Sequence, residues 1–536
     1  MIVIPLQNFV GALPTGRHSP LIALVLVCVV LAATGQRIVI ATPTATTKTE
    51  TVTRVIHINP PGPNDSRYFY LPFDVPGHAV RIHVSYQYDR ARDTNTLDIG
   101  LFDARSTGSD TDPRGFRGWS GGRRSEFFVS RHEATPGYLR GEMPAGKWRI
   151  ILGLYRVAPG GVDVSFKIDI ETNANGSRSS TTGANGSSLS ASDTPVRSIA
   201  EAGTPRPWSR QAGPHGLRWW RGDLHMHTVH SDGNWTIAEL ISSALNSGLD
   251  FIAITDHNTA SHHEEIDRLT GGLRRPLVVR GEEITTYGGH TNAWGLPSGR
   301  WIDFRTHPGD TSRISNIAAQ AHRAGAVISI NHPFVLCGGC SWSYDPAARD
   351  FDAIEVWNGP WDFTDEPAVR MWDKILQSGR RITAIASSDS HRPDTPIGKP
   401  STHVGATVLT QATLLTAIRQ GHVYLTDGAS PFLVSLEAEL ATGKRRARWT
   451  IGDQIRLKAS GTIRFFIASG KTRPGATVSL ISNGEVIRSF PARTDGEPQV
   501  FEVECQHDSY FRLEVRDGAK AMIALTNPIY VRIKPL

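Results

Sequence analysis

The chain contains few cysteines, and their spacing excludes most structural roles of cysteine. Its 536 residues include four, and only Cys337 and Cys340, in Cys-Gly-Gly-Cys, form a close pair. A zinc ribbon needs a second such pair, so a structural zinc site of that kind is excluded. With glycine at both middle positions and no clear helix after it, the pair is a poor match to a redox motif. We expect a short local disulfide or two unreactive thiols in a loop.

A strong charge imbalance is also absent. The formal net charge is +6, which is small for a chain of 536 residues. We therefore expect no specific nucleic-acid binding. The basic stretches at 114–124 and 444–446 are interpreted as solvated surfaces. No phosphate-binding glycine motif follows a suitable strand, so we expect no nucleotide cofactor.

No apolar run clearly reaches the roughly 20 residues that a membrane-spanning helix needs. Residues 21–33 form a shorter run after Arg17, with small residues at 33–35, which is typical of the h-region of a signal peptide. Apolar residues at 38–41 extend the run, so an uncleaved anchor is the alternative. Residues 1–41 are thus predicted to be a signal peptide or a membrane anchor. The rest would be exported, as a periplasmic, extracellular or membrane-anchored protein.

Changes in composition divide the rest of the chain into four segments. Residues 54–172 alternate like β-strands, which predicts an N-terminal β-sandwich, interpreted as an accessory domain without a metal or catalytic constellation. Residues 173–213 are rich in Ser, Thr, Gly and Asn, which predicts a flexible linker. Residues 214–430 predict an α/β domain. Residues 431–536 return to β patterning, with a hairpin turn at Asn483-Gly484, and predict a C-terminal β-sandwich.

Within residues 214–430, short and nearly all apolar strands alternate with helices, as in a parallel sheet covered by helices. The apolar residues Ile237, Leu240, Ile241 and Ala244 recur with helical spacing. The expected strands span 219–225, 251–255, 277–284, 327–330, 353–357 and 382–386. The expected helices span 236–247, 264–270, 313–325, 368–378 and 412–420. We therefore predict an α/β unit, with a barrel as the favoured form.

Candidate metal ligands follow these strands. His225 and His227 are two residues apart in a strand-like stretch, so their imidazoles share a face. Imidazole is a common ligand of zinc, iron and manganese. Further imidazoles and carboxylates follow at Asp232, Asp256, His257, Glu282, Glu283, His290, His332, Asp389 and His391. In parallel α/β proteins functional groups gather at the carboxyl ends of strands, so we expect these groups to converge.

Each of these residues also has a structural interpretation. A lone histidine such as His290 is usually a surface or core residue, and Asp256 could cap a helix. Successive strands that all end in His, Asp or Glu are harder to explain in this way. Without a partner, so many converging groups would repel one another or stay desolvated. A cluster of divalent cations would satisfy them.

Five motifs together resemble the PHP (polymerase and histidinol phosphatase) superfamily. They are H-x-H-x-x-x-S-D-G from His225, I-T-D-H ending at His257, R-G-x-E ending at Glu283, N-H-P around His332 and S-D-S-H ending at His391. The export signal, the added β domains and the stretches at 354–359 and 421–424 resemble its carbaryl-hydrolase branch. The resemblance implies a distorted (β/α)7 barrel with two or three divalent ions, of zinc, manganese or iron.

The resemblance also implies a ligand set. By position, the first ion would be held by His225, His227, Glu283 and Asp389, the second by Glu283, His290 and His332, and the third by Asp232, His257 and His391. Many relatives have histidine where this chain has Asp232, which puts the third ion in question. Glu282 adjoins Glu283, so the bridging assignment could shift by one residue. Asp256 and Asn331 are expected to orient ligands.

Catalytic residues are harder to assign than metal ligands. The predicted set is Asp389, His391 and Arg392. Arg392 and Lys399 could steady an anionic substrate, or they could simply face solvent. His263 or Asp389 could relay a proton to the leaving group.

Three functions remain open. The preferred one is an exported metal-dependent phosphoesterase that uses metal-bound hydroxide on small phosphorylated or nucleotide-like substrates. The second applies the same chemistry to a carbamate, a carboxylic ester or an amide, which an aromatic pocket would favour; Trp294, Trp342, Trp357 and Trp361 are candidates for it. The third is a non-catalytic surface binding protein, and the complete ligand set argues against it. The sequence does not predict an oligomeric state.

Overall fold

The computed structural model describes residues 47–90, 94–173, 213–273, 275–345, 349–429, 433–440, 447–470 and 473–533. The predicted signal peptide or anchor lies outside these residues, as does nearly all of the predicted linker. Among the helices of the described part, none is both long and apolar enough to cross a membrane.

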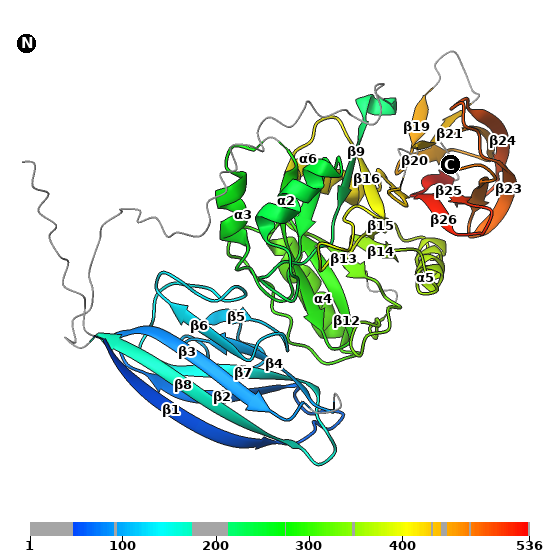
Figure 1. Cartoon of the computed structure of the whole chain (residues 1–536). Helices are drawn as coiled ribbons and strands as arrows, with labels where there is room; N and C mark the ends of the chain where they lie inside the picture. Colours follow the sequence, from blue (N-terminus) through cyan, green and yellow to red (C-terminus); the bar gives the residue numbers. More distant parts are fainter. Residues whose placement is uncertain are drawn as a thin grey trace, which may run out of the picture. The chain divides into compact units, whose positions relative to one another are not determined.

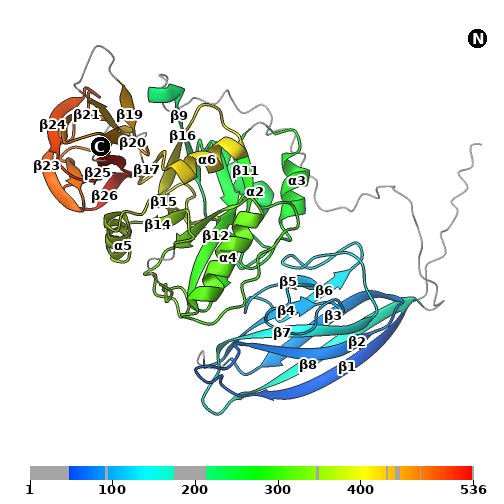
Figure 2. The same ribbon diagram turned by 180° about the vertical axis from the view of Figure 1, so that it is seen from behind.

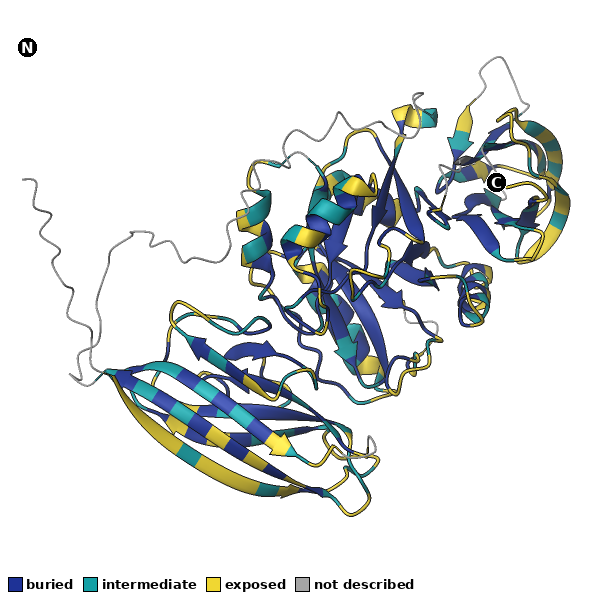
Figure 3. Cartoon of the chain, in the orientation of Figure 1, coloured by how far each residue is buried: buried dark blue, intermediate teal, exposed yellow. Residues whose placement is uncertain are grey.

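The N-terminal strands form two four-stranded sheets. One has the order β1 (Thr47–Ile58), β8 (Val162–Asn173), β3 (Ala79–Tyr88), β6 (Glu126–Ser130). The other has the order β2 (Tyr68–Val75), β7 (Gly146–Arg156), β4 (Thr96–Phe102), β5 (Phe116–Trp119). Side chains of both sheets share one apolar core, for example Ile82 and Phe166 from the first and Ile99 and Ile150 from the second. Burial alternates along β8 and β3, as expected for strands with one buried face (Figure 3).

The central sheet follows the short 3₁₀ helix η3 (Pro214–Gly216). Its strand order is β15 (Thr383–Ser387), β14 (Ala353–Asn358), β13 (Val327–Asn331), β12 (Gly289–Trp294), β11 (Leu277–Thr286), β10 (Phe251–Ile254), β9 (Arg218–Asp223), β16 (Ser401–Ala406), β17 (Val423–Thr426). All residues of β10, β13 and β15 are buried, which explains their largely apolar sequence. The expected strands of this region are all present.

Helices join these strands and pack on them (Figures 1 and 2). The described residues contain α2 (Ile237–Asn246), α3 (His263–Thr270), α4 (Thr311–Arg323), α5 (Asp365–Gln377) and α6 (Gln411–Gln420). Each agrees with an expected helix. In α2 the predicted apolar face is buried, and the Thr236 hydroxyl and the Glu239 carboxylate cap its first turn reciprocally. Gly421 ends α6 in the left-handed conformation.

Three strands of the central sheet depart from the expected β/α alternation. β12, β16 and β17 were not predicted. β12 pairs antiparallel with both β11 and β13, and β16 pairs antiparallel with β9. The pairs β9–β10, β10–β11, β13–β14 and β14–β15 are parallel. The sheet is therefore mixed, and only part of it consists of classical strand–helix–strand units.

The C-terminal strands extend the central sheet. β17 pairs with β26 (Met522–Thr526), which continues through β25 (Ser509–Arg516) and β22 (Thr477–Ser482) to β23 (Glu485–Pro491), with β27 (Ile529–Ile533) and β20 (Gln454–Leu457) alongside. A separate four-stranded sheet has the order β19 (Arg448–Thr450), β18 (Leu433–Leu440), β21 (Gly461–Gly470), β24 (Gln499–Cys505). The hairpin at Asn483-Gly484 is confirmed: β22 pairs with β23, and both turn residues have positive φ.

A buried arginine ties β25 to α5. Arg512 is 1% exposed and donates from Nη2 to Asp373 at 2.5 Å, from Nε to the same carboxylate at 3.0 Å and from Nη1 to Glu514 at 2.8 Å. These bonds satisfy a guanidinium that water cannot reach. Removing it would deprive the largely buried Asp373 carboxylate of this counter-charge and leave Glu514 paired with Arg516.

We therefore expect Arg512→Met to lower the free energy of unfolding by roughly 3–5 kcal/mol. Urea denaturation followed by tryptophan fluorescence measures this change. The matched control is Arg54→Met on exposed β1, where we expect a change within about 0.5 kcal/mol. Equal denaturation midpoints for the two variants would contradict the structural role of Arg512.

Candidate metal centre

The segments that follow the central strands meet in one place. His225 and His227 come directly after β9, and His227 N donates to Ser390 O at 3.0 Å in the segment after β15. The backbone of His257, after β10, pairs with that of Glu283 on β11 in an isolated parallel β-bridge. His290 lies at the start of β12, beside Asn331 at the end of β13. Backbone pairing thus brings together the groups that the sequence predicted to converge.

Glu283 lies at the centre of this cluster. Its Oε2 is 2.8 Å from His257 Nδ1 and 3.3 Å from His225 Nε2. Its Oε1 is 3.2 Å from both His290 Nδ1 and His332 Nε2. One buried carboxylate therefore lies among imidazoles from four different segments, as a ligand that bridges two cations would.

Asp389 shares two of these imidazoles. Its Oδ1 is 3.0 Å from His227 Nε2 and 3.4 Å from His225 Nε2. The ligand atoms of His225, His227 and Glu283 lie within 4.8 Å of one another, close enough to hold one ion. The four residues predicted for the first ion are thus adjacent.

The predicted third group is also assembled. Asp232 Oδ1 is 3.3 Å from His391 Nε2 and 3.5 Å from His257 Nε2. His227 joins these three in a set whose ligand atoms lie within 4.8 Å of one another. A carboxylate and imidazoles are a competent ligand set for zinc or manganese.

The unpaired atoms of the cluster indicate what it would bind. His225 Nε2, His227 Nε2, Glu283 Oε2 and Asp389 Oδ1 are buried and have no hydrogen-bond partner among the described residues. Burying such polar atoms without partners is costly. All four are ligand atoms directed at one another, so a divalent cation between them would satisfy all of them at once. The residues present therefore fit a metal.

Electrostatics within the cluster agree with this arrangement. Burial raises the pKa of Glu283, but His225, His257 and His290 outweigh it and hold the pKa well below its usual value. The pKa of Asp389 is likewise well below its usual value, because nearby imidazoles overcome the effect of burial. Burial, with His391 and His257, lowers the pKa of His227 to about 4. Ionised carboxylates and a neutral imidazole are the forms that bind metal.

Asp256 and Asn331 support the cluster as predicted. Asp256 accepts bonds from Thr228 N at 2.7 Å and Ser231 Oγ at 2.6 Å, which fixes the loop that leads to Asp232. Asn331 Nδ2 donates to Glu283 Oε1 at 3.0 Å. Both are therefore placed to orient predicted ligands.

Two supporting carboxylates were missed in the sequence. Glu355, in the middle of the otherwise apolar β14, lies 3.3 Å from His225 Nδ1 and accepts from His332 N at 3.1 Å. Asp223, the last residue of β9, accepts from Ser388 N at 3.1 Å. The available signal was a lone acidic residue in a largely buried strand, because a buried acidic residue usually has a fixed partner.

The structure separates the two adjacent glutamates. Glu282 points to the opposite side of β11, where its Oε2 accepts from Ile302 N at 2.8 Å. Burial raises the pKa of Glu282 well above its usual value. Glu283, not Glu282, therefore lies among the imidazoles of the cluster.

Of the predicted substrate and proton-relay residues, Asp389 lines the cavity beside the cluster, and the others do not. Arg392 and Lys399 are exposed and are not among the described residues that line the cavity beside the cluster. His263 is buried, and its Nε2 contacts Gly281 O at 3.0 Å. Of the candidate tryptophans, Trp294 and Trp357 are core residues. Among the predicted catalytic residues, only Asp389 and His391 line this cavity.

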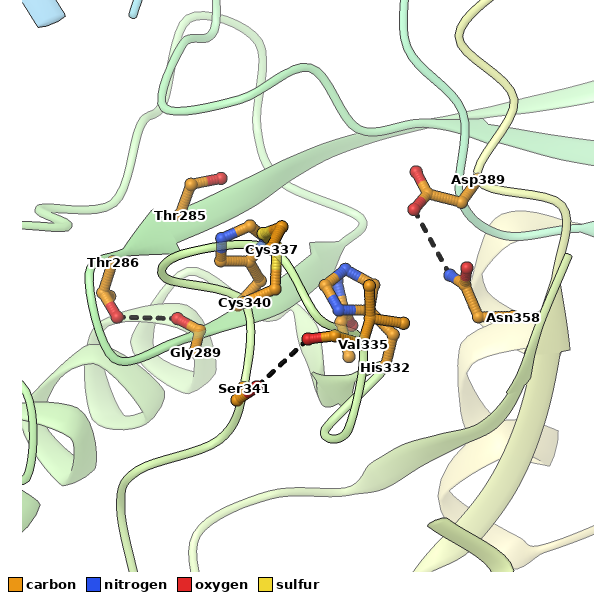
Figure 4. The surroundings of a disulfide bond; sticks show 12 residues. Thr285, Thr286, Gly289, His332, Val335, Cys337, Cys340, Ser341, Asn358 and Asp389 are labelled. Carbon is orange, nitrogen blue, oxygen red and sulfur yellow. Dashed lines mark hydrogen bonds between the residues drawn. A yellow bond between two sulfur atoms is a disulfide. The ribbon is translucent and has the colours of Figure 1, made fainter. Parts of the chain in front are cut away.

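A disulfide joins Cys337 to Cys340 in the loop after His332, which confirms the first of the two alternatives for this pair (Figure 4). The cavity is lined by this loop, through Val335 and Cys340, and by Asp389. The loop after β13 therefore forms part of the boundary of the site.

A serine motif near the cavity was also missed. Gly118-Trp119-Ser120-Gly121-Gly122 has the G-x-S-x-G spacing of a hydrolase nucleophile, and Ser120 lines the cavity. However, Ser120 follows β5 and precedes β6 with no helix between them, and its hydroxyl contacts Tyr138 Oη at 3.0 Å. The strand–turn–helix context of a nucleophile elbow is therefore missing here.

A comparison with protein families agrees with this geometry. Residues 223–287 match the family model described as the PHP domain. The matched segment includes His225, His227, Asp232, His257 and Glu283. The other predicted ligands come later in the chain and join the site through the fold.

Individual relatives cover different shares of the chain. The DNA polymerase/3'-5' exonuclease PolX of Bacillus subtilis (strain 168) is 32% identical over 77 residues, so the match spans 12% of this chain and only 14% of that protein. A crystal structure of a two-domain protein from Bacteroides vulgatus, containing a predicted PHP-like metal-dependent phosphoesterase, covers 61% of this chain and 100% of that chain at 18% identity, with a TM-score of 0.35. An amidohydrolase from Chromobacterium violaceum, with bound SO4 and no metal, covers 38% of this chain and 96% of that chain at 14% identity, with a TM-score of 0.26.

The adjacent glutamates provide a matched test of the metal centre. We expect Glu283→Gln to weaken metal binding by more than the roughly 10–100-fold typical of a supporting residue, because it removes the charge that bridges the cluster. Glu282→Gln should retain metal, because a protonated glutamic acid and glutamine are similar in shape. Metal titration of both purified variants measures this. Equal metal content would contradict the assignment of Glu283.

Proposed function

We propose that the protein is a metal-dependent hydrolase, and specifically a phosphoesterase that acts on small phosphorylated or nucleotide-like substrates. The observation that carries the proposal is the convergence of unpaired, buried imidazole and carboxylate atoms around Glu283 and Asp389. The match of residues 223–287 to the PHP domain supports the same assignment.

The residues divide into holding, bridging and orienting roles. His225, His227 and Asp389 would hold one ion, His290 and His332 a second, and Asp232, His257 and His391 a third, with Glu283 between the first two. Bound divalent ions would lower the pKa of a water molecule and polarise the bond under attack. Glu355 and Asn331 keep His225 and Glu283 in place through the hydrogen bonds described above.

We propose that the strands around this site form a distorted (β/α)7 barrel of the PHP type. Thr402 on β16 supports closure of the barrel, because its hydroxyl donates to Ala386 O and accepts from Ala386 N of β15 at 2.5 and 3.0 Å. Side-chain bonds thus link two strands that do not pair in the sheet order. The site opens at the carboxyl ends of the parallel strands, as in barrel enzymes generally.

Export is part of the proposal. The disulfide between Cys337 and Cys340 favours an oxidising compartment such as the periplasm or the cell exterior. The apolar segment at 21–33 would provide the export signal.

A second candidate function is hydrolysis of an aryl carbamate or carboxylic ester, as in the carbaryl-hydrolase branch. Trp119, Tyr155, Tyr287 and Phe304 line the cavity beside the cluster and favour an aromatic substrate. The same metal chemistry would serve either bond, so the substrate decides between the two functions.

The test is metal analysis of the purified protein combined with a panel of phosphomonoesters, phosphodiesters, aryl carboxylic esters and an aryl carbamate. We expect bound transition metal and preferential hydrolysis of a phosphoester. His225→Ala combined with His227→Ala should abolish both, because it removes two ligands of one ion. The control is His57→Ala, which changes an exposed histidine of β1. Full activity in the double variant would refute the metal mechanism, and hydrolysis confined to carbamates or carboxylic esters would favour the second function.

A further inference from the structure

A cavity of about 520 Å³ lies beside the metal cluster, and its lining comes from two distant parts of the chain. The cluster contributes Glu283, Asp389 and five further predicted ligands to this lining: Asp232, His257, His290, His332 and His391. The N-terminal β-sheets contribute Thr96, Asp98, Trp119 and Tyr155, and the loop between β5 and β6 contributes Ser120 and Arg123. The sequence interpretation of these sheets as an accessory domain included no site residue, so this contribution is a finding of the structure.

Hydrogen bonds hold the N-terminal sheets beside the metal cluster. Tyr287 Oη donates to Asp98 Oδ2 at 2.7 Å, and Gly153 on β7 lacks the Cβ that would collide with this tyrosine. Arg124 Nη2 donates to Val229 O at 2.7 Å, in the loop that leads to Asp232. Thr259 Oγ1 donates to Gly137 O at 2.9 Å. The contact therefore involves the same loops that carry metal ligands.

A buried charge strengthens this contact. Arg305 is 1% exposed, and its nearest counter-charge is Asp303 at 2.8 Å. Its guanidinium also donates to Tyr70 Oη at 2.7 Å and Asp112 O at 2.8 Å, both in the N-terminal segment. Separating the two segments would deprive a buried guanidinium of these acceptors. The N-terminal part of the cavity wall is therefore held in place before any substrate binds.

Aromatic rings occur in both parts of the lining. The Trp119 ring lies 4.8 Å from Phe304, and the Tyr155 ring lies 5.8 Å from Tyr287, between ring centroids. Trp119 and Phe304 are buried, whereas Tyr155 and Tyr287 are partly exposed. Such surfaces bind a planar apolar group of a ligand by stacking or edge contact.

Arg123 adds a positive charge. Among the described residues that line the cavity, it is the side chain with a permanent positive charge. Its Nη2 donates to Asn234 Oδ1 at 2.5 Å, and Asn234 N donates to His391 O at 2.7 Å. The guanidinium is thereby held near the segment of a predicted metal ligand. Its remaining N–H donors match the oxygens of a phosphoryl group.

We propose that the N-terminal β-sheets form part of the substrate site, and that the substrate is an aryl phosphoester whose ring contacts Tyr155 and Trp119 while Arg123 attracts its phosphoryl charge. The proposal rests on the phosphoesterase function proposed above. It assigns the N-terminal segment a role in specificity, with the metal cluster as the place of bond cleavage.

Binding of two stable phosphonates to the metal-loaded full chain tests the proposal. Phenylphosphonate and methylphosphonate share the anionic group and differ in the ring. By isothermal titration we expect phenylphosphonate to bind about threefold to tenfold more tightly. Tyr155→Ala should reduce this preference, and Tyr155→Phe should preserve it. Arg123→Gln should weaken both ligands, whereas Arg54→Gln, on exposed β1, should weaken neither.

The outcomes separate this proposal from the one on which it rests. Hydrolysis of phosphoesters together with equal binding of the two phosphonates would overturn the aryl assignment alone. An unchanged preference in Tyr155→Ala, or unchanged affinities in Arg123→Gln, would overturn the role of the N-terminal segment. A metal-loaded chain that hydrolyses no phosphoester would overturn the phosphoesterase function and this proposal with it.

Discussion

The burial of Glu283 among imidazoles is the constraint on which the rest of the site depends. The Glu283 carboxylate lies within 3.5 Å of five histidines. Burying so many ionisable groups away from water is costly unless each has a well-placed partner. Each histidine comes from a different strand end or loop, except the His225–His227 pair. The sheet must therefore hold several segments in register at once. Asp223, Asp256 and Glu355 meet that need through hydrogen bonds to backbone and ring nitrogens.

The backbone is also strained where the ligands turn inward. Asp389 and His332 both have positive φ, a conformation that residues with a Cβ rarely adopt. Asp389 is held there in part by Asn358 Nδ2, at 3.3 Å from its Oδ2 (Figure 4). His332 N donates to Glu355 at 3.1 Å. A neighbouring side chain thus stabilises each strained residue, which is the pattern expected where ligand direction matters more than local stability.

The sequence predicted most of the residues that converge in the cluster but fewer of the residues that position them. His225 and His227 could be predicted from strand periodicity, and convergence followed from the common edge of parallel strands. Glu355 could not, because its partner His225 is 130 residues away and the pairing depends on the register of β14. β12 and β16 were missed because polar residues, such as Asn292 in β12 and Thr402 in β16, interrupt the apolar pattern by which the other short strands were predicted. The contact of Tyr287 with Asp98 joins residues that are 189 positions apart in the sequence. It depends on how the N-terminal sheets pack against the central sheet, which the periodicity of apolar residues does not predict.

Protons and metal ions compete for the nitrogen atoms of this cluster. Although burial opposes it, Asp232 and Asp389 raise the pKa of His391 to about 9, and Glu283 raises the pKa of His257 and His332. Without metal, these imidazoles thus tend to hold protons that offset the buried carboxylates. Metal coordination needs the neutral ring, so each ion that binds displaces protons and takes over their electrostatic role. The same carboxylates therefore pair with protonated imidazoles in the metal-free state and with cations in the metal-bound state. Their charge is balanced in both states, which explains how a stable fold can contain so much buried charge.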